Sequence, residues 1–286
     1  MSRTVGRRAF RCSAVLTASA ALSVTLGMSA EAQRAPATDV LPRRVSPGDT
    51  LLHGERITSG RSRYSLTMYR DADEIPVGRL TDAVRVDTID GTAIILRVQQ
   101  LQRGTVTLVD STTTHALTLA PRTRRALQQN RRVLLEFSGR RVKGAVAPLD
   151  VPPVPLDTTL ALAPFDASNW ELLLRALPLE QGFAARFPVY EPDVGLREYR
   201  VVVTGSTAIQ GEPAHVVTLT IARNRESVVW VSQRSGLVLQ IETLLGETTL
   251  LRQVLVREPL PAIDRAASSR PLHRRPYDDP DHDEEQ

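Results

Sequence analysis

The residues best suited to catalysis in this sequence are few, and their spacing favours structure over chemistry. Asp90-Gly91-Thr92 is similar to the active-site loop of an aspartic protease, but that loop has the order Asp, Thr or Ser, Gly. It also needs a second copy so that two carboxyls share a proton, and no second copy occurs here. Because an Asp-Gly pair adopts positive φ at low cost, the triplet predicts a hairpin turn.

The other groups that could act on a substrate are dispersed along the chain. His53, His115 and His215 have no histidine or acidic neighbour at metal-ligand spacing, so we expect no metal site and no cofactor. The motifs G-x-S-x-G, H-E-x-x-H and C-x-x-C and a glycine-rich phosphate loop are absent from the sequence, which disfavours the common hydrolases and nucleotide enzymes. A hydrolase with catalytic residues far apart in sequence stays open, and its candidate acids are Asp87, Glu136 and Glu242.

The first 32 residues have the features of a signal peptide. Four arginines precede an apolar stretch from Ser13 to Met28, and Ala30-Glu31-Ala32 supplies an A-x-A cleavage site. We therefore expect export by the Sec route to the periplasm or the cell exterior, with cleavage after Ala32, while Arg7-Arg8 leaves the twin-arginine (Tat) route open. Because the apolar stretch is short, we expect a mature protein that is not membrane-spanning.

The basic sequence pI of 9.7 does not indicate a nucleic-acid partner. Cleavage would remove four arginines and one glutamate, so the formal net charge would fall from +4 to +1. Lys143 is the only lysine among 36 basic residues, whereas phosphate-binding surfaces ordinarily use both types. Cys12, the single cysteine, lies in the segment that is removed, so we expect no disulfide in the mature chain.

From Arg61 onward, apolar and polar residues alternate between turn signals, which is typical of β-strands. Pairs of strands flank Asp90-Gly91, Ser138-Gly139 and Ser235-Gly236, and each pair predicts a hairpin. Successive hairpins form a meander, so we predict a mainly β fold. Further strands are expected over residues 106–109, 116–119, 201–203, 216–221 and 250–256.

Composition predicts the boundaries of the domain. We expect a flexible N-terminal arm over residues 33–60, a single β domain over 61–258 with a Pro-rich linker at 148–155, and a disordered, charged tail over 259–286. Ser168-Asn169-Trp170-Glu171 matches a capping box and predicts one short helix, Ser168 to Leu177. Residues 122–132 fit either a polar helix or a long hairpin arm.

Several strands lack clean alternation, as in Val228-Val229-Trp230-Val231 and Leu237-Val238-Leu239, which indicates that both faces of the sheet are covered there. A helix of two or three turns is only about 15 Å long and cannot cover a sheet of about ten strands. The pattern alone leaves two alternatives open. One is a sandwich or filled barrel, and the other is a half-barrel whose concave surface holds an apolar ligand.

The stretch from Arg61 to Glu258, in particular Ala116 to Pro121, Phe137 to Gly144 and Val228 to Leu239, resembles uncharacterised envelope proteins grouped with the LolA/LolB lipoprotein-carrier superfamily. The resemblance implies a strongly curved antiparallel half-barrel closed by helices. It also implies a concave face that accepts acyl chains or another apolar molecule. It assigns no site residue, because no arginine here aligns with the one that holds the lid of a carrier.

We therefore expect a large, curved antiparallel sheet that binds or carries a lipid, a lipoprotein acyl chain or another apolar molecule, without catalysis. The alternatives are an envelope scaffold that binds a protein partner and the hydrolase with dispersed residues. The residues expected to line the cavity are Trp170, Leu173, Val229, Val231, Val238 and Ile241. Arginines that could meet a polar head group at the rim are Arg223, Arg225 and Arg234.

Overall fold

A computed structural model of the chain describes residues 42–257. It confirms the mainly β prediction, because sixteen strands form one sheet that accompanies a single short α-helix. The strands are β1 (Arg43–Arg44), β2 (Gly60–Arg70), β3 (Asp73–Ile89), β4 (Thr92–Arg103), β5 (Val106–His115), β6 (Pro121–Leu127), β7 (Arg131–Ser138), β8 (Arg141–Pro148), β9 (Val154–Thr159), β10 (Phe165–Asp166), β11 (Ala184–Glu191), β12 (Gly195–Ile209), β13 (Glu212–Ala222), β14 (Arg225–Ser232), β15 (Val238–Leu244) and β16 (Thr249–Leu255). The helices are the 3₁₀ turns η1 (Gly54–Arg56) and η2 (Ala167–Asn169) and the α-helix α1 (Trp170–Ala176).

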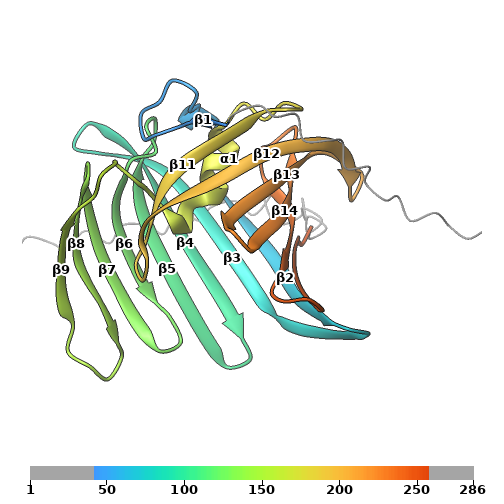
Figure 1. Cartoon of the computed structure of the whole chain (residues 1–286), viewed down its shortest axis with the longest axis horizontal. Helices are drawn as coiled ribbons and strands as arrows, with labels where there is room; N and C mark the ends of the chain where they lie inside the picture. Colours follow the sequence, from blue (N-terminus) through green and yellow to red (C-terminus); the bar gives the residue numbers. More distant parts are fainter. Residues whose placement is uncertain (1–41, 258–286) are drawn as a thin grey trace, which may run out of the picture. The chain divides into compact units, whose positions relative to one another are not determined.

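The sheet consists of two runs of antiparallel hairpins joined in its middle. Strands β11 to β16 lie in sequence order, β16 then pairs with β2, and β2 to β9 follow in sequence order. At one end, β1 and β10 both pair in parallel with β11; at the other end lies β9. The sheet is unclosed and strongly curved, with β11 and β12 crossing in front of strands of the other run (Figure 1).

Helix α1 lies on the face that we call the inner face, between the two runs of strands (Figure 1). Its apolar residues Leu172, Leu173 and Leu174 are 1–2% exposed and belong to a core that includes Val217 of β13 and Val229 of β14. The same core contains residues of β3 and β4, so one short helix fills the space between the runs near one rim. No helix among residues 42–257 has the length and apolar character needed to cross a membrane.

The predicted Asp-Gly turn is present between β3 and β4. Asp90 and Gly91 have φ values of 50° and 74°, which is the left-handed geometry that closes a two-residue hairpin. The turn after Ser138 is also found, with Gly139 at a φ of 57°. Local turn chemistry therefore determines these hairpins.

Some segments differ from the sequence-based expectations. Residues 116–119 form the turn between β5 and β6 rather than a strand, and Leu119 has a φ of 54° that no strand residue adopts. Residues 122–132 belong to the β6–β7 hairpin. The segment 148–155, expected as a linker, ends β8, turns and begins β9, where Pro155 is tolerated because β9 is an edge strand.

The N-terminal arm and the tail can be compared only in part. Within the expected flexible arm, residues 42–60 include β1 and η1 and bury Val45, Leu52 and Ile57, because these apolar side chains join the core under α1. The expected signal peptide, residues 1–32, and the expected tail, 259–286, lie outside the described residues.

Candidate functional site

A buried ion pair network attaches the start of α1 to the inner face. The Arg97 side chain on β4 is 2% exposed, and its Nε and Nη2 donate to the two carboxylate oxygens of Asp82 at 2.9 and 2.8 Å. Its Nη1 donates to Glu171 Oε2 and to the Ser168 carbonyl oxygen, both at 2.9 Å. One guanidinium thereby joins β3, β4 and the first turn of the helix.

A second network lies beside the first, on β5 and β6. Arg124 donates to Asp110 at 2.6 Å and to Asp166 at 3.3 Å, and the Asp166 side chain is 1% exposed. Between the two arginines, the Asn169 amide bonds the hydroxyls of Thr112 and Thr114 at 3.0 and 3.1 Å. From the end of β10 to the start of α1, every polar side chain thus forms a hydrogen bond or an ion pair with a neighbouring group.

The capping box predicted at Ser168 to Glu171 is wrong. Asp166 accepts from the Ser168 backbone N–H at 2.9 Å and caps η2, while the Glu171 carboxylate is turned to Arg97. Burial raises the pKa of Glu171, and the adjacent Arg97 guanidinium opposes that rise. Burial likewise raises the pKa of Asp166, opposed by Arg124.

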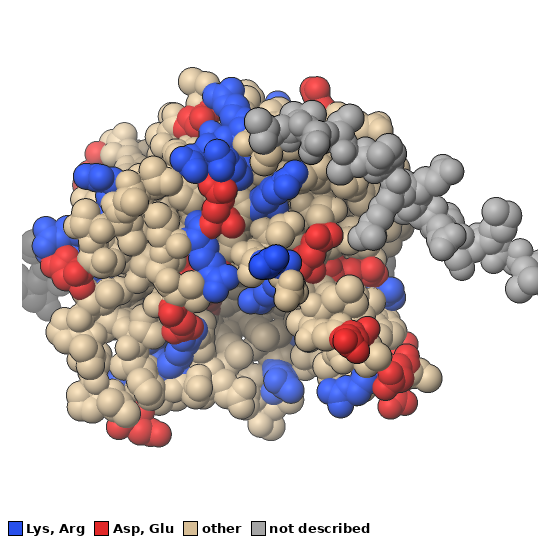
Figure 2. All heavy atoms as spheres, in the orientation of Figure 1, with Lys and Arg blue, Asp and Glu red and all other residues tan. Residues whose placement is uncertain are grey.

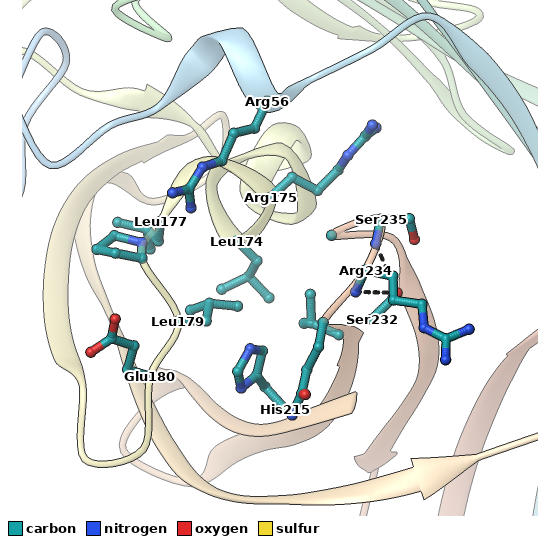
Figure 3. A pocket seen from close by; sticks show the side chains of 14 residues that line it. Arg56, Leu174, Arg175, Leu177, Leu179, Glu180, His215, Ser232, Arg234 and Ser235 are labelled. Carbon is teal, nitrogen blue, oxygen red and sulfur yellow. Dashed lines mark hydrogen bonds between the residues drawn. The ribbon is translucent and has the colours of Figure 1, made fainter. Parts of the chain in front are cut away.

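Next to the C-terminal end of α1 lies a pocket of about 540 Å³, within the range that small-molecule sites occupy (Figure 3). Its walls come from η1, α1, the segment after α1, β13, and the end and following turn of β14. Buried leucines and a valine form the apolar part, and polar side chains surround it. The lining includes Arg56, Leu174, Arg175, Leu179, Glu180, His215, Val231 and Arg234.

Three arginines on different sides of the pocket have no carboxylate partner within 4.0 Å among residues 42–257: Arg56, Arg175 and Arg234. The Nε of Arg175 is buried without a hydrogen-bond partner, and its Nη2 reaches only the Thr58 carbonyl oxygen at 3.5 Å. Burial lowers the pKa of Arg175, which indicates that the charge is poorly solvated. In Figure 3 the Arg175 guanidinium is directed away from the centre of the pocket, so the aliphatic part of this side chain forms the wall.

The pocket also contains one histidine and one acid. Burial lowers the pKa of His215, although nearby Glu180 opposes this change, so the imidazole is neutral at pH 7. With three arginines against one glutamate, the lining is electropositive. Elsewhere the charges are mixed, and the face in Figure 2 shows basic and acidic side chains interspersed, without a large area of one sign.

The six residues expected to line a cavity all lie in or against the core beneath α1. Five are 8% exposed or less, and Trp170 is partly buried and packs against them. Of the six, Val231 lines the pocket. Of the arginines proposed for a head group, Arg234 lines the pocket, and Arg223 and Arg225 do not. The five buried residues are Leu173, Val229, Val231, Val238 and Ile241.

The acids considered for a hydrolase are not brought together. Asp87, Glu136 and Glu242 lie on β3, β7 and β15, which are not neighbours in the sheet. Asp87 pairs with Arg85 at 2.9 Å and Glu242 with Arg252 at 2.7 Å. Among residues 42–257, no group of three histidine, cysteine or acidic side chains is arranged to hold a metal ion.

Comparison with known proteins assigns the chain to a family. A family model described as "Protein of unknown function (DUF3108)" matches residues 63–252. The chain belongs to the DUF3108 family. The DUF3108 region therefore runs from β2 to β16 and includes α1, both ion pair networks and most of the pocket lining.

Among solved structures, the DUF3108 protein is similar to a LolA superfamily protein from Nitrosomonas europaea, with 14% sequence identity and a TM-score of 0.21. The similarity covers 75% of this chain and 95% of that chain. No curated protein matches the sequence.

Proposed function

We propose that this DUF3108 protein binds an apolar molecule that carries an anionic group, in the pocket at the end of α1. The observation that supports the proposal most directly is the set of three arginines without carboxylate partners around a mainly polar pocket whose floor contains buried leucines and a valine. An apolar contact alone would not require arginine at this place. A phosphate or carboxylate group would meet Arg56, whose side chain is directed over the pocket (Figure 3), and an attached hydrocarbon would lie against Leu174, Leu179 and Val231.

The energies of such a complex are favourable. Each methylene removed from water contributes roughly 0.8 kcal/mol, so about ten methylenes offset the several kcal/mol lost on association. A charge-assisted hydrogen bond to Arg56 adds to this, because Arg56 has no carboxylate within 4.0 Å among residues 42–257. Micromolar affinity corresponds to about 8 kcal/mol beyond this offset, so it needs several further methylenes together with charge-assisted hydrogen bonds to the arginines.

The six residues expected to line the cavity enter the proposal as the deeper part of the same apolar region. Trp170 and Leu173 belong to α1 and the other four lie in the core that α1 joins, so a long chain would reach Val229 and Ile241 only if α1 moved away from the sheet. The bonds of Arg97 and Arg124 to the start of α1 oppose that movement. The pocket at the other end of α1 is the part that admits a ligand without any displacement.

We further propose that binding takes place outside the cytoplasm, on the basis of the N-terminal segment described in the sequence analysis. Mass spectrometry of the protein isolated from its own cells tests this. A mature chain beginning at Gln33 is expected, and a full-length chain in the cytoplasm would contradict the proposal.

Native mass spectrometry of protein purified from its own source would show whether a ligand is carried. A fluorescent fatty acid then gives the affinity by titration. We expect the double variant Arg56→Gln, Arg234→Gln to weaken binding at least about tenfold, because it removes at least one charge-assisted hydrogen bond to the anionic group. Arg223→Gln is the matched control, because Arg223 is exposed and does not line the pocket.

The outcomes separate the alternatives. An empty protein that also fails to bind the probe would favour an envelope scaffold or interaction domain. If Arg223→Gln weakens probe binding as much as the double variant Arg56→Gln, Arg234→Gln does, the arginine charges act at a distance and the pocket is not the binding site.

A further inference from the structure

One rim of the sheet carries an unusual number of exposed apolar side chains. Five hairpin turns lie there in the sheet order β15–β16, β2–β3, β4–β5, β6–β7 and β8–β9. The first two are neighbours, since the Asp71 N–H donates to the Thr248 carbonyl oxygen at 3.3 Å. Fifteen large apolar side chains are exposed among residues 42–257, and eight lie at or near these turns: Ile75, Val106, Leu127, Leu149, Val151, Val154, Leu244 and Leu245.

At the opposite ends of the same ten strands, fewer apolar side chains are exposed. There the turns contain two exposed apolar side chains, Leu117 and Ile89, and Val256 follows the end of β16. That rim is the one that α1 and the segment 45–59 cover, since Ala116 and Leu119 pack in the core with Leu52 and Ile57. The rim with the eight apolar residues, which we call the hairpin rim, has no helix upon it among the described residues.

The apolar residues of the hairpin rim are spread among charged ones. Residues 70–76, 103–106, 127–132, 148–154 and 244–249 contain four arginines and five acids, so the rim is close to neutral. In Figure 2, the lower edge of the molecule, where the β4–β5, β6–β7 and β8–β9 turns lie in Figure 1, is mainly uncharged with isolated charged groups. A protein-binding surface usually has a contiguous apolar centre from which charges are depleted.

The spacing of the hairpins gives a different arrangement. Neighbouring strands are about 4.8 Å apart, so successive turns lie about 10 Å apart and present one to three exposed apolar side chains each, in a row. Such a row suits a layer of lipid headgroups, in which each apolar tip enters between headgroups and each charge stays in water. Near neutrality means that attraction to anionic lipid contributes little.

From these observations we propose that the hairpin rim docks on the surface of a phospholipid bilayer, with Leu244 and Leu245 entering deepest. These two are 61% and 54% exposed and lie side by side in the β15–β16 turn. The proposal rests on the rim alone and is independent of the pocket.

Co-sedimentation with vesicles tests the proposal. The purified protein is mixed with vesicles of phosphatidylcholine and with vesicles of phosphatidylcholine and phosphatidylglycerol in equal parts. We expect binding to both, with partition coefficients within about threefold of each other, because the rim is nearly neutral. The double variant Leu244→Ser, Leu245→Ser should lower the partition coefficient at least about tenfold, since two largely exposed leucines no longer transfer into the interface.

Leu117→Ser is the matched control, because Leu117 is 63% exposed at the opposite rim. It should leave vesicle binding unchanged, and circular dichroism should show both variants folded. The pocket variant Arg56→Gln, Arg234→Gln should also retain vesicle binding, so failure of the pocket proposal is distinguishable from failure of this one. Absence of vesicle binding by the unaltered protein would overturn the proposal. So would an equal decrease in Leu117→Ser, or concentration-dependent dimerisation through Leu244 and Leu245 without vesicle binding.

Discussion

Replacing Arg97 by leucine removes the positive charge that Asp82 and Glu171 share on the inner face. The guanidinium makes two bonds to Asp82, one to Glu171 and one to a backbone carbonyl, all at 2.8–2.9 Å. Removing one partner of a buried ion pair costs about 3–5 kcal/mol, because the remaining charge is left without compensation. Both carboxylates keep 13% exposure, so we expect about 3 kcal/mol, at the lower end of that range.

Urea unfolding at pH 8, followed by circular dichroism, measures this decrease in unfolding free energy. Arg85→Leu is the matched control, because Arg85 is 67% exposed and pairs with Asp87 at the surface; it should cost less than about 1 kcal/mol. Replacing Asp82, Arg97 and Glu171 together by apolar residues should recover most of the stability, since no unpaired charge remains.

The loss of unfolding free energy caused by Arg97→Leu should depend on pH. Burial raises the pKa of Glu171 above its ordinary value of 4.5, and the Arg97 charge opposes the rise, so the variant raises this pKa further. A carboxyl whose pKa is higher in the folded state destabilises the fold when ionised, and this cost is relieved as the pH falls through the folded pKa towards 4.5. The difference between Arg97→Leu and the unaltered protein should therefore shrink between pH 8 and pH 5. A destabilisation below about 1 kcal/mol, or a deficit that grows on acidification, would refute the reasoning.

Further substitutions test three separate features. In Gly54→Ala the new Cβ would lie 1.9 Å from a backbone oxygen and should cost more than about 2 kcal/mol of unfolding free energy, whereas Gly205→Ala, with open space around it, should change stability by less than about 1 kcal/mol. At the β3–β4 turn, Asp90→Asn should be neutral and Asp90→Val should cost roughly 1–2 kcal/mol, because a β-branched residue resists a φ of 50°; thermal unfolding compares them. Asn169→Leu leaves two threonine hydroxyls without their amide partner and should cost about 2–3 kcal/mol in urea unfolding, with recovery when both threonines are changed to valine; lack of recovery would contradict that cause.

The sheet could be predicted because its determinants are local. Asp90-Gly91 and Ser138-Gly139 specify turns through backbone geometry that two residues supply, and period-two alternation marks the strands on either side. The 116–119 segment misled the prediction because an apolar run in a turn has the same composition as a short strand. Ala116 and Leu119 fill the core under α1, while Leu117 is exposed, so the segment does not extend the sheet.

The buried networks and the pocket could not be predicted from local patterns. Arg97 and Glu171 are 74 positions apart, and a serine three residues before a glutamate looks like a capping box whether or not the glutamate is used elsewhere. The pocket collects Arg56, Arg175 and Arg234 from three segments that only the curved sheet brings to one place. The strands with consecutive apolar residues did indicate that something covers the inner face. Helix α1 supplies that cover near one rim.

The pairing of β16 with β2 has a consequence for how the chain attains this sheet. Seven residue pairs, from Thr249 with Arg70 to Leu255 with Tyr64, join the last strand to one of the first, in the middle of the sheet. All other antiparallel neighbours are consecutive in the chain, so this seam is the one antiparallel pairing that must wait for residue 255. A circular permutant that begins at β11, runs through β16 into the segment leading to β2 and ends after α1 would place every antiparallel pair in sequence order. Its contact order would fall, and it should fold faster than the natural order of strands allows.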